Sequence, residues 1–203
     1  MSLGLIGYKI KMISFYKKNK IVPITIIKII DNYIIKYIYN NKYKSILIGY
    51  HLKNKINKPL KGIINKVNIN CTKFKEFKIK NFFKYKIGEN INISIFKNIK
   101  YVNITANSKG KGFQGVVKRY NFSGVGGTTH GQHNRLRTTG SIGAGSSPSR
   151  VFKGRKMPGK MGNKKNTIRK LKIYKIDIIK NLIYIKGSVP GFKKKYIIIN
   201  KYK

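Results

Sequence analysis

Short runs of β-branched and aromatic residues, separated by turn-forming residues, dominate the first quarter of the chain. The runs span residues 5–15, 21–30, 33–39 and 44–51. The breaks between them fall at Lys17 to Lys20, at Asp31-Asn32 and at Asn40-Asn41. Asparagine tolerates the positive φ of a tight turn, so these breaks predict the turns of a β-meander.

Further along, the pattern predicts one short helix and several more strands. A proline suited to a first helical turn, Pro59, precedes Ile63, Ile64 and Val67, which share one helical face. Strands are expected at residues 91–96, 99–105, 171–178 and 182–187 and at Tyr196 to Ile199, with a turn near Lys180-Asn181. Many short strands with turns between them favour a mainly β fold, a closed or nearly closed β-barrel.

Between Thr105 and Thr167 the composition changes abruptly. Isoleucine, common elsewhere, occurs there once, whereas 13 of the 20 glycines lie between Gly110 and Gly162, and no acidic residue occurs between Glu89 and Asp177. Such a segment cannot bury enough apolar surface to fold by itself. A stretch of this length without a core is either functional or disordered.

The charge indicates a polyanionic partner. The chain has 46 Lys and Arg against 4 Asp and Glu, a formal net charge of +42. Self-repulsion of this size destabilises a compact chain unless a polyanion neutralises it. Nucleic acid is the first candidate. An anionic membrane surface is the second, but it calls for an amphipathic helix that the strand-like pattern does not offer.

The arginines separate a functional signal from codon bias. Abundant Asn, Ile, Lys and Tyr are typical of an A+T-rich genome, which could account for many lysines. It cannot account for the arginines, which all lie in one central quarter of the chain: Arg119, Arg135, Arg137, Arg150, Arg155 and Arg169. Arginine forks onto phosphate or stacks on bases, and glycine lets the backbone approach phosphate closely. An RNA-binding extension is favoured over a flexible glycine linker.

The other apparent motifs carry little weight. Residues 110–115 match the dinucleotide pattern G-x-G-x-x-G, but we expect neither a helix opening at the third glycine nor the required acid. Residues 154–161 approach a P-loop, but Met161 replaces its Ser or Thr. His130 and His133 have no carboxylate or thiol nearby in sequence, Cys71 is alone, and the acids are scattered. An enzyme is therefore not expected. The alternatives to an RNA-binding protein are a nucleotide-dependent enzyme and an architectural DNA-binding protein.

Several spaced motifs resemble the universal ribosomal protein L-three family of the large subunit, in its bacterial and organellar form. They are LIGYKIKM (Leu5–Met12), SKGKGFQGVVKR (Ser108–Arg119), THG (Thr129–Gly131), GSIG (Gly140–Gly143), RVFKGRKM (Arg150–Met157), GKMGN (Gly159–Asn163) and IKGSVPG (Ile185–Gly191). The resemblance covers nearly the whole chain, although residues 53–90 match poorly.

The resemblance implies a six-stranded barrel of the translation-protein type and a long extension threading into large-subunit rRNA toward the peptidyl transferase centre. It implies a structural role, early in subunit assembly, with rRNA and neighbouring ribosomal proteins as partners. We accordingly expect residues 1–106 to form the first part of the barrel, with a helical insertion near 53–90. Residues 107–165 form the extension, and residues 166–203 complete the barrel.

The predicted rRNA contacts are the cations and histidines in and beside the extension. They are Lys109, Lys111, Lys118, Arg119, His130, His133, Arg135, Arg137, Arg150, Lys153, Arg155, Lys156, Lys160, Lys164, Lys165 and Arg169. No cofactor or metal site is expected, apart from magnesium held through rRNA, and neither a membrane nor a second copy of the chain is expected as a partner.

Two departures from the family matter. Many bacterial relatives carry a methylated glutamine where this chain has Ser146, so that modification should be absent. Where relatives often carry His-Arg, this chain has Leu136-Arg137. The form of residues 143–148 resembles plastid versions, and no targeting peptide is evident at Met1 to Tyr8. We therefore expect a plastid-type organelle such as an apicoplast, with a mitochondrion or a bacterial cytoplasm as alternatives.

Overall fold

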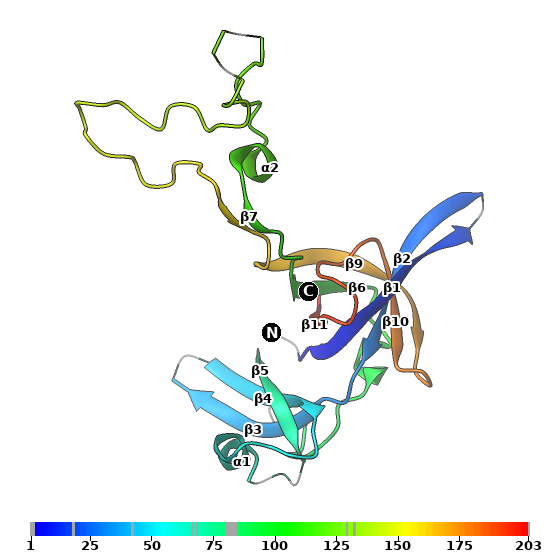
Figure 1. Ribbon diagram of the computed structural model, residues 1–203. Helices are drawn as coiled ribbons and strands as arrows, with labels where there is room; N and C mark the ends of the chain where they lie inside the picture. Colours follow the sequence, from blue (N-terminus) through cyan, green and yellow to red (C-terminus); the bar gives the residue numbers. More distant parts are fainter. Residues whose placement is uncertain are drawn as a thin grey trace. The chain divides into compact units, whose positions relative to one another are not determined.

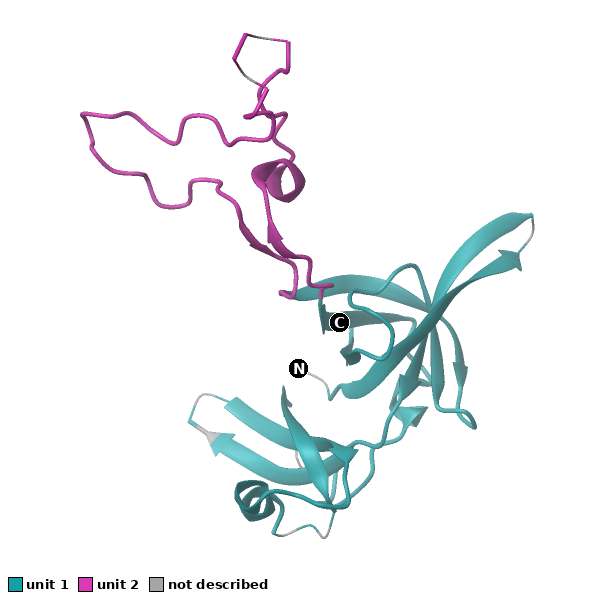
Figure 2. Ribbon diagram, viewed as in Figure 1, with its two compact units in different colours: residues 1–107, 165–203 teal, residues 108–164 magenta. Residues whose placement is uncertain are grey.

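The chain forms two compact units in the computed structural model (Figures 1 and 2). The first comprises Met1–Asn107 with Lys165–Lys203, and the second comprises Ser108–Lys164. The structure describes residues 3–17, 19–41, 43–65, 67, 69–79, 85–128, 130–131 and 133–202. The predicted turn residue Lys18, parts of the predicted insertion (residues 66, 68 and 80–84) and Thr129 of the THG motif lie outside these residues.

Six strands of the first unit close into an antiparallel barrel. They are β1 (Leu5–Lys17), β2 (Lys20–Ile29), β6 (Tyr101–Asn107), β9 (Lys165–Asp177), β10 (Leu182–Lys186) and β11 (Tyr196–Lys201), paired in the order β1-β11-β6-β9-β10-β2. The predicted mainly β class is confirmed. Asn19 and Asn181 have the positive φ expected at the β1–β2 and β9–β10 turns, 58° and 53°.

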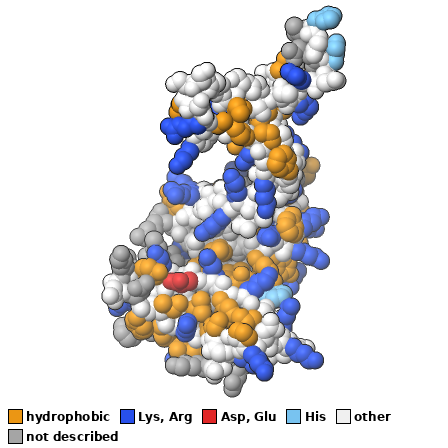
Figure 3. Space-filling model, turned by 60° about the vertical axis from the view of Figure 1, so that its left-hand side comes forward, with side chains coloured by type: hydrophobic (Ala, Val, Ile, Leu, Met, Phe, Trp, Pro, Cys, Tyr) orange, Lys and Arg blue, Asp and Glu red, His pale blue; other side chains and the backbone are white. Residues whose placement is uncertain are grey.

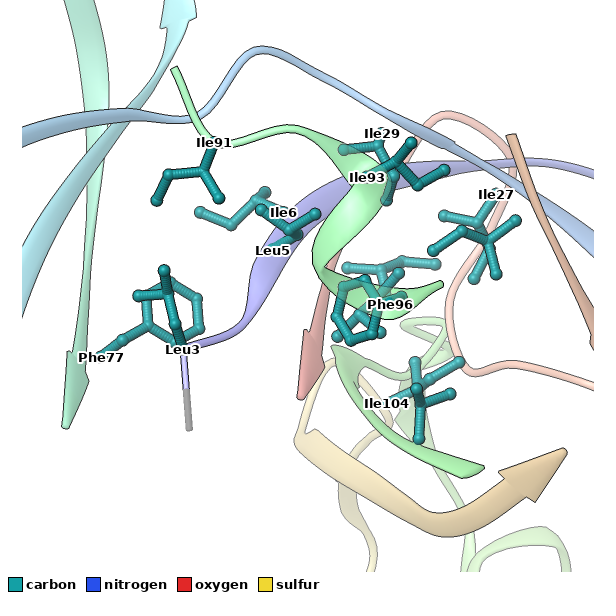
Figure 4. Packing of buried hydrophobic residues seen from close by; sticks show 14 of the residues in the cluster. Leu3, Leu5, Ile6, Ile27, Ile29, Phe77, Ile91, Ile93, Phe96 and Ile104 are labelled. Atoms are coloured by element: carbon teal, nitrogen blue, oxygen red, sulfur yellow. The ribbon is translucent and has the colours of Figure 1, made fainter. Parts of the chain in front are cut away.

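The barrel core follows from the alternation of side chains along each strand. In β6, Val102, Ile104 and Ala106 are buried, and in β11 Ile197 and Ile199 are buried. Successive side chains of a strand point to opposite faces, so these residues line the inside of the barrel. Figure 4 shows this apolar cluster continuing through β1 and β2.

The predicted strand at residues 91–96 is wrong, because Ile93–Phe96 form a 3-10 helix, η1. Ile93 and Phe96 are both completely buried. Residues three apart lie on one side of a 3-10 turn, whereas in a strand they would point to opposite faces. Tertiary packing at the barrel core therefore overrides the strand-like composition of this segment (Figure 4).

A second sheet contains two of the runs that the sequence placed in the barrel, so that expectation is corrected. β3 (Tyr33–Asn40) and β4 (Tyr43–Leu52) pair with β5 (Cys71–Lys78) in the order β3-β4-β5. The predicted short helix is α1 (Lys58–Ile64). The sequence did not reveal β5, because half of its residues are charged and its apolar positions are few.

One buried polar residue links the two sheets where the chain passes from β2 to β3. The Asn32 side chain is fully buried; its Oδ1 accepts from the Ile6 backbone at 3.0 Å and its Nδ2 donates to the Ile6 carbonyl at 3.1 Å. A buried amide left without these partners would cost free energy. Farther along the interface, the hydroxyl of Tyr196 on β11 lies 2.6 Å from Nδ1 of His51 on β4.

Among the described residues, no helix is long and apolar enough to cross a membrane.

The close packing of β4 on β5 predicts the effect of a single methyl group. A Cβ at Gly49 would lie 2.8 Å from Ile35 Cδ1 and 2.9 Å from Cys71 Cβ, whereas a Cβ at Gly62 would meet nothing within 4 Å. Gly49→Ala should lower the free energy of unfolding by about 1–3 kcal/mol through overpacking. Gly62→Ala, within α1, should leave it unchanged or raise it by up to about 1 kcal/mol. Urea unfolding of both variants measures the difference, and equal stabilities would contradict the packing described here.

The buried thiol of Cys71 predicts a pH dependence. Burial raises the pKa of Cys71 to about 11 from an ordinary value of 9.0. A raised pKa means that the folded state holds the proton more tightly, so this stabilisation is present below about pH 9 and is lost as pH rises toward about pH 11. The free energy of unfolding of the native chain should therefore fall more over this range than that of Cys71→Ala. Parallel slopes for the two proteins would show that burial does not perturb the thiol.

Candidate RNA interface

The second unit starts from a short two-stranded ladder. β7 (Gly112–Gln114) pairs antiparallel with β8 (Gly159–Met161), with Phe113 opposite Lys160. Just outside the ladder, the Ser108 backbone N–H donates to the Lys164 carbonyl at 2.9 Å. The outgoing and returning chains are therefore held together at the base of the second unit by backbone hydrogen bonds (Figure 2).

A five-residue helix, α2 (Val116–Tyr120), follows β7 directly. Val116 is 1% exposed, and Asn121 ends the helix in the left-handed conformation at φ 60°. This corrects the expectation that no helix opens at the third glycine of the G-x-G-x-x-G match, because Gly115 is the N-cap of α2. The preceding strand, however, belongs to an antiparallel ladder rather than to a parallel sheet, and no acid follows before Asp177. The match therefore remains unrelated to dinucleotide binding.

Arg119 has a partner within the second unit. Its Nη1 donates to the Met157 carbonyl at 2.6 Å, and a Cβ at Gly159 would lie 2.6 Å from the same nitrogen. The side chain is half-buried, unlike the other predicted contacts. Sequence reasoning treated Arg119 only as an RNA contact and missed this role. The one available signal was the glycine at position 159, which leaves room for the guanidinium.

Two glycines of the second unit permit close contacts between backbone segments. Gly162 has φ +77°, and a Cβ there would lie 2.0 Å from the Lys109 carbonyl oxygen. Gly124 has φ +82°, and a Cβ there would lie 2.1 Å from the Leu136 carbonyl oxygen. Only glycine combines this conformation with this proximity. Gly162, which follows the near-match to a P-loop, is therefore needed for the packing of two chain segments.

The remaining predicted contacts present their charges to solvent. The predicted residues with exposed side chains are Lys109, Lys111, Lys118, His130, His133, Arg135, Arg137, Arg150, Lys153, Arg155, Lys156, Lys160, Lys164, Lys165 and Arg169. Lys165 and Arg169 lie in β9 of the first unit, not in the second. Figure 3 shows basic side chains spread over the visible face of the protein.

Aromatic faces accompany these charges. Lys156 Nζ lies 5.8 Å from the ring centroid of Tyr120 and 6.0 Å from that of Phe122, and the Arg150 guanidinium lies 5.6 Å from the centroid of Phe152. Phe113 is 74% exposed and Phe152 is 60% exposed. Exposed aromatic rings beside cations can stack on bases while the cations contact phosphates.

His130 and His133 are both exposed. Within the described part of the chain, no group of three or more His, Cys, Asp or Glu side chains is placed to hold a metal ion. Ser146 is also exposed, and its carbonyl accepts from the Ser149 hydroxyl at 3.0 Å. Within the described part of the chain, neither histidine side chain has a hydrogen-bond partner that would give it a structural role like that of Arg119.

The protein combines a closed β-barrel with a glycine-rich unit that has no acidic residue and exposes cations and aromatic rings. These features are typical of a protein that binds a polyanion. The family model for ribosomal protein L3 matches residues 65–181. The chain belongs to the ribosomal protein L3 family, which confirms the resemblance found in the sequence.

Curated relatives match over nearly their whole length. The large ribosomal subunit protein uL3 of Thermosipho africanus is 39% identical over 202 residues, covering 98% of both chains. The uL3 of Buchnera aphidicola is 44% identical over 195 residues, covering 93% of both. The uL3 of Pelagibacter ubique is 40% identical over 205 residues, covering 98% of this chain and 86% of the relative.

The contact between Arg119 and Met157 predicts a local effect of mutation. Arg119→Gln should speed backbone amide exchange at Lys111 and across β7–β8 by about tenfold, equivalent to about 1.4 kcal/mol, because a charge-assisted hydrogen bond is lost. Lys118→Gln removes the neighbouring exposed charge and serves as the control. Hydrogen exchange read by mass spectrometry measures both variants. Equal protection in the two would show that Arg119 does not hold the second unit together.

Proposed function

We propose that the second unit, Ser108–Lys164, is the main rRNA-binding element of a structural constituent of the large ribosomal subunit. Membership of the L3 family makes the chain a ribosomal structural protein and not an enzyme. The single observation that carries the assignment to the second unit is its charge. It contains twelve Lys and Arg residues and no acid.

The mechanism is electrostatic and steric. Cations of the second unit neutralise phosphates that would otherwise repel one another where rRNA helices approach. Glycines bring the backbone close to the RNA, and the exposed rings of Phe113 and Phe152 offer stacking faces. In this proposal the first unit docks on rRNA while the second takes the place of metal ions and water between helices. Arg119 contributes by ordering the second unit.

The resemblance extends the proposal to the site and time of action. From the resemblance we propose that the second unit reaches toward the peptidyl transferase centre and that the protein joins early in subunit assembly. Its partners are large-subunit rRNA and neighbouring ribosomal proteins, and it acts as a single copy. In this proposal the protein needs no cofactor, and any structural magnesium is held by the rRNA.

Two further proposals concern the cellular compartment of the protein and the modification state of residue 146. The relatives named above are bacterial, which fits a bacterial cytoplasm. The plastid-type organelle stays a prediction from residues 143–148 and from the A+T-rich composition. Ser146 cannot accept the amide methylation of a glutamine, so we propose that this position is unmodified. Mass measurement of the protein purified from ribosomes tests that statement.

An architectural DNA-binding protein would share the charge but not the preference for RNA. A structured large-subunit rRNA fragment should displace the protein from duplex DNA at lower concentration than duplex DNA displaces it from the rRNA fragment. The opposite order of competition would favour the DNA-binding alternative.

Salt dependence supplies a quantitative prediction. Binding to a structured rRNA fragment should weaken steeply with salt, with a slope of log affinity against log salt of about −0.9 for each phosphate contact in a duplex region. Replacing Arg150, Arg155 and Lys156 with Ala should make this slope shallower and impair incorporation into large subunits. The strand content by circular dichroism should not change, because these residues lie outside the barrel.

The matched control removes three exposed lysines near α1, by replacing Lys55, Lys58 and Lys61 with Ala. This control lowers the net charge by the same amount as the triple variant at Arg150, Arg155 and Lys156. If the control lowers rRNA affinity and the salt slope as much as the triple variant of the second unit, then total charge and not this unit determines binding. Loss of strand content in the triple variant would instead mean that the segment is part of the core.

A further inference from the structure

A cationic groove lies within the first unit, between β5 of the second sheet and the barrel. A cavity of about 540 Å³ lies against β5, β6, β9 and β11, and a second cavity of about 300 Å³ shares Lys75, Thr105, Lys165 and Ile198 with it. The shared residues join the two cavities into one feature, which we call the β5–β9 groove. Lys78 and Arg169 are exposed, so the groove opens to solvent.

The wall on the barrel side is polar because of the strand register. Thr105 on β6 pairs with Thr167 on β9 and with Ile198 on β11. Lys165, Thr167 and Arg169 alternate along β9, so they share one face. These positions alternate with the buried residues of the barrel core; Thr105 is buried beneath the groove, whereas Lys165, Thr167 and Arg169 are exposed. The result is a recess whose floor is made of hydroxyl and amide groups.

Charge in the groove is almost entirely positive. Its cations are Lys75, Lys78, Lys165, Arg169, Lys195 and Lys201. Among the described residues that line it, Glu76 is the one acid. Cations gathered along one groove repel one another and together create a positive potential that attracts anions. An anion in the groove would relieve this repulsion.

The floor can donate hydrogen bonds to an anion. The hydroxyls of Thr105 and Thr167 lie 2.9 Å apart. Their mutual bond uses one of two hydroxyl hydrogens, which leaves one hydrogen to donate elsewhere. At one end of the groove, Tyr202 is 40% exposed and packs edge-on to Tyr101 at 6.5 Å. Tyrosine rings in such positions can stack on an unpaired base.

We propose that the β5–β9 groove binds a single-stranded RNA segment, with its phosphates on the lysines and a base against Tyr202. The inference rests on the proposed function, because it gives the first unit an RNA site distinct from the second unit. A cavity of this size falls within the range of about 300–1,000 Å³ that holds small ligands. It suits one or two nucleotides and excludes a duplex, whose bases are already paired and stacked.

The test uses the full chain and a fluorescein-labelled oligouridine of about eight nucleotides, followed by fluorescence anisotropy. Lys75→Gln with Lys201→Gln should weaken binding by about tenfold and reduce the salt slope by about 0.7 for each lost phosphate contact. The control, Lys20→Gln with Lys180→Gln, removes two exposed lysines outside the groove and should leave binding nearly unchanged. Circular dichroism establishes that all variants fold.

Photo-cross-linking provides a second readout that does not depend on charge. A 4-thiouridine oligonucleotide should cross-link to peptides of β5, β9 or β11. Cross-links confined to Ser108–Lys164 would overturn the inference, as would equal losses in the groove and control variants. Competition by oligoglutamate as effective as that by oligouridine would also overturn it and would assign the groove to an acidic peptide.

Failure of the proposed function gives a different result. The triple alanine variant at Arg150, Arg155 and Lys156 should lose affinity for the structured rRNA fragment while keeping its affinity for oligouridine. If that variant binds the structured fragment normally, the role of the second unit is wrong, whereas the groove is judged by its own variants. Loss of oligouridine binding in the triple variant but not in the groove variant would overturn the groove.

Discussion

The antiparallel pairing of β6 with β9 is the contact on which the rest of the structure depends. It completes the barrel between β11 and β10, and it places Asn107 opposite Lys165, the residues through which the chain leaves and re-enters the first unit. Closing a long segment costs conformational entropy, and the barrel hydrogen bonds offset that cost. The same pairing sets Thr105 beside Thr167 and so forms the floor of the β5–β9 groove.

A bulge in this pair shows how the ladder accommodates extra sequence. The register shifts between Val102 and Ile104, and Lys170 on β9 adopts a positive φ of 55°. The Lys170 backbone N–H donates to Asn103 Oδ1 at 3.0 Å, so the residue excluded from the ladder keeps a hydrogen bond. A bulge increases local twist, which helps a short strand pair to curve around a barrel. Polar side chains on β6 therefore support its geometry as well as lining the groove.

The two units are stabilised in different ways. The first buries isoleucine, leucine and phenylalanine in a large apolar cluster, with a smaller cluster around Ile35, Ile64 and Cys71. The second has no comparable cluster among its described residues and is held by backbone bonds, by close approach at Gly124 and Gly162, and by Arg119. Polar contacts of this kind contribute little net free energy in water. The dense positive charge of such a unit therefore destabilises its folded form unless RNA neutralises that charge.

The sequence by itself determined the strand-rich class, most strand positions, the boundaries of the acid-free segment and the family, because alternation, composition and spaced motifs are local properties of the chain. It could not determine that β3 and β4 pair with β5 instead of entering the barrel, that Ile93–Phe96 coil into a 3-10 helix, or that Arg119 contacts Met157. Nor could it single out Lys75 and Lys201, which line the β5–β9 groove, among the many lysines of the chain. Partners distant in sequence decide these features, and only tertiary packing brings them together.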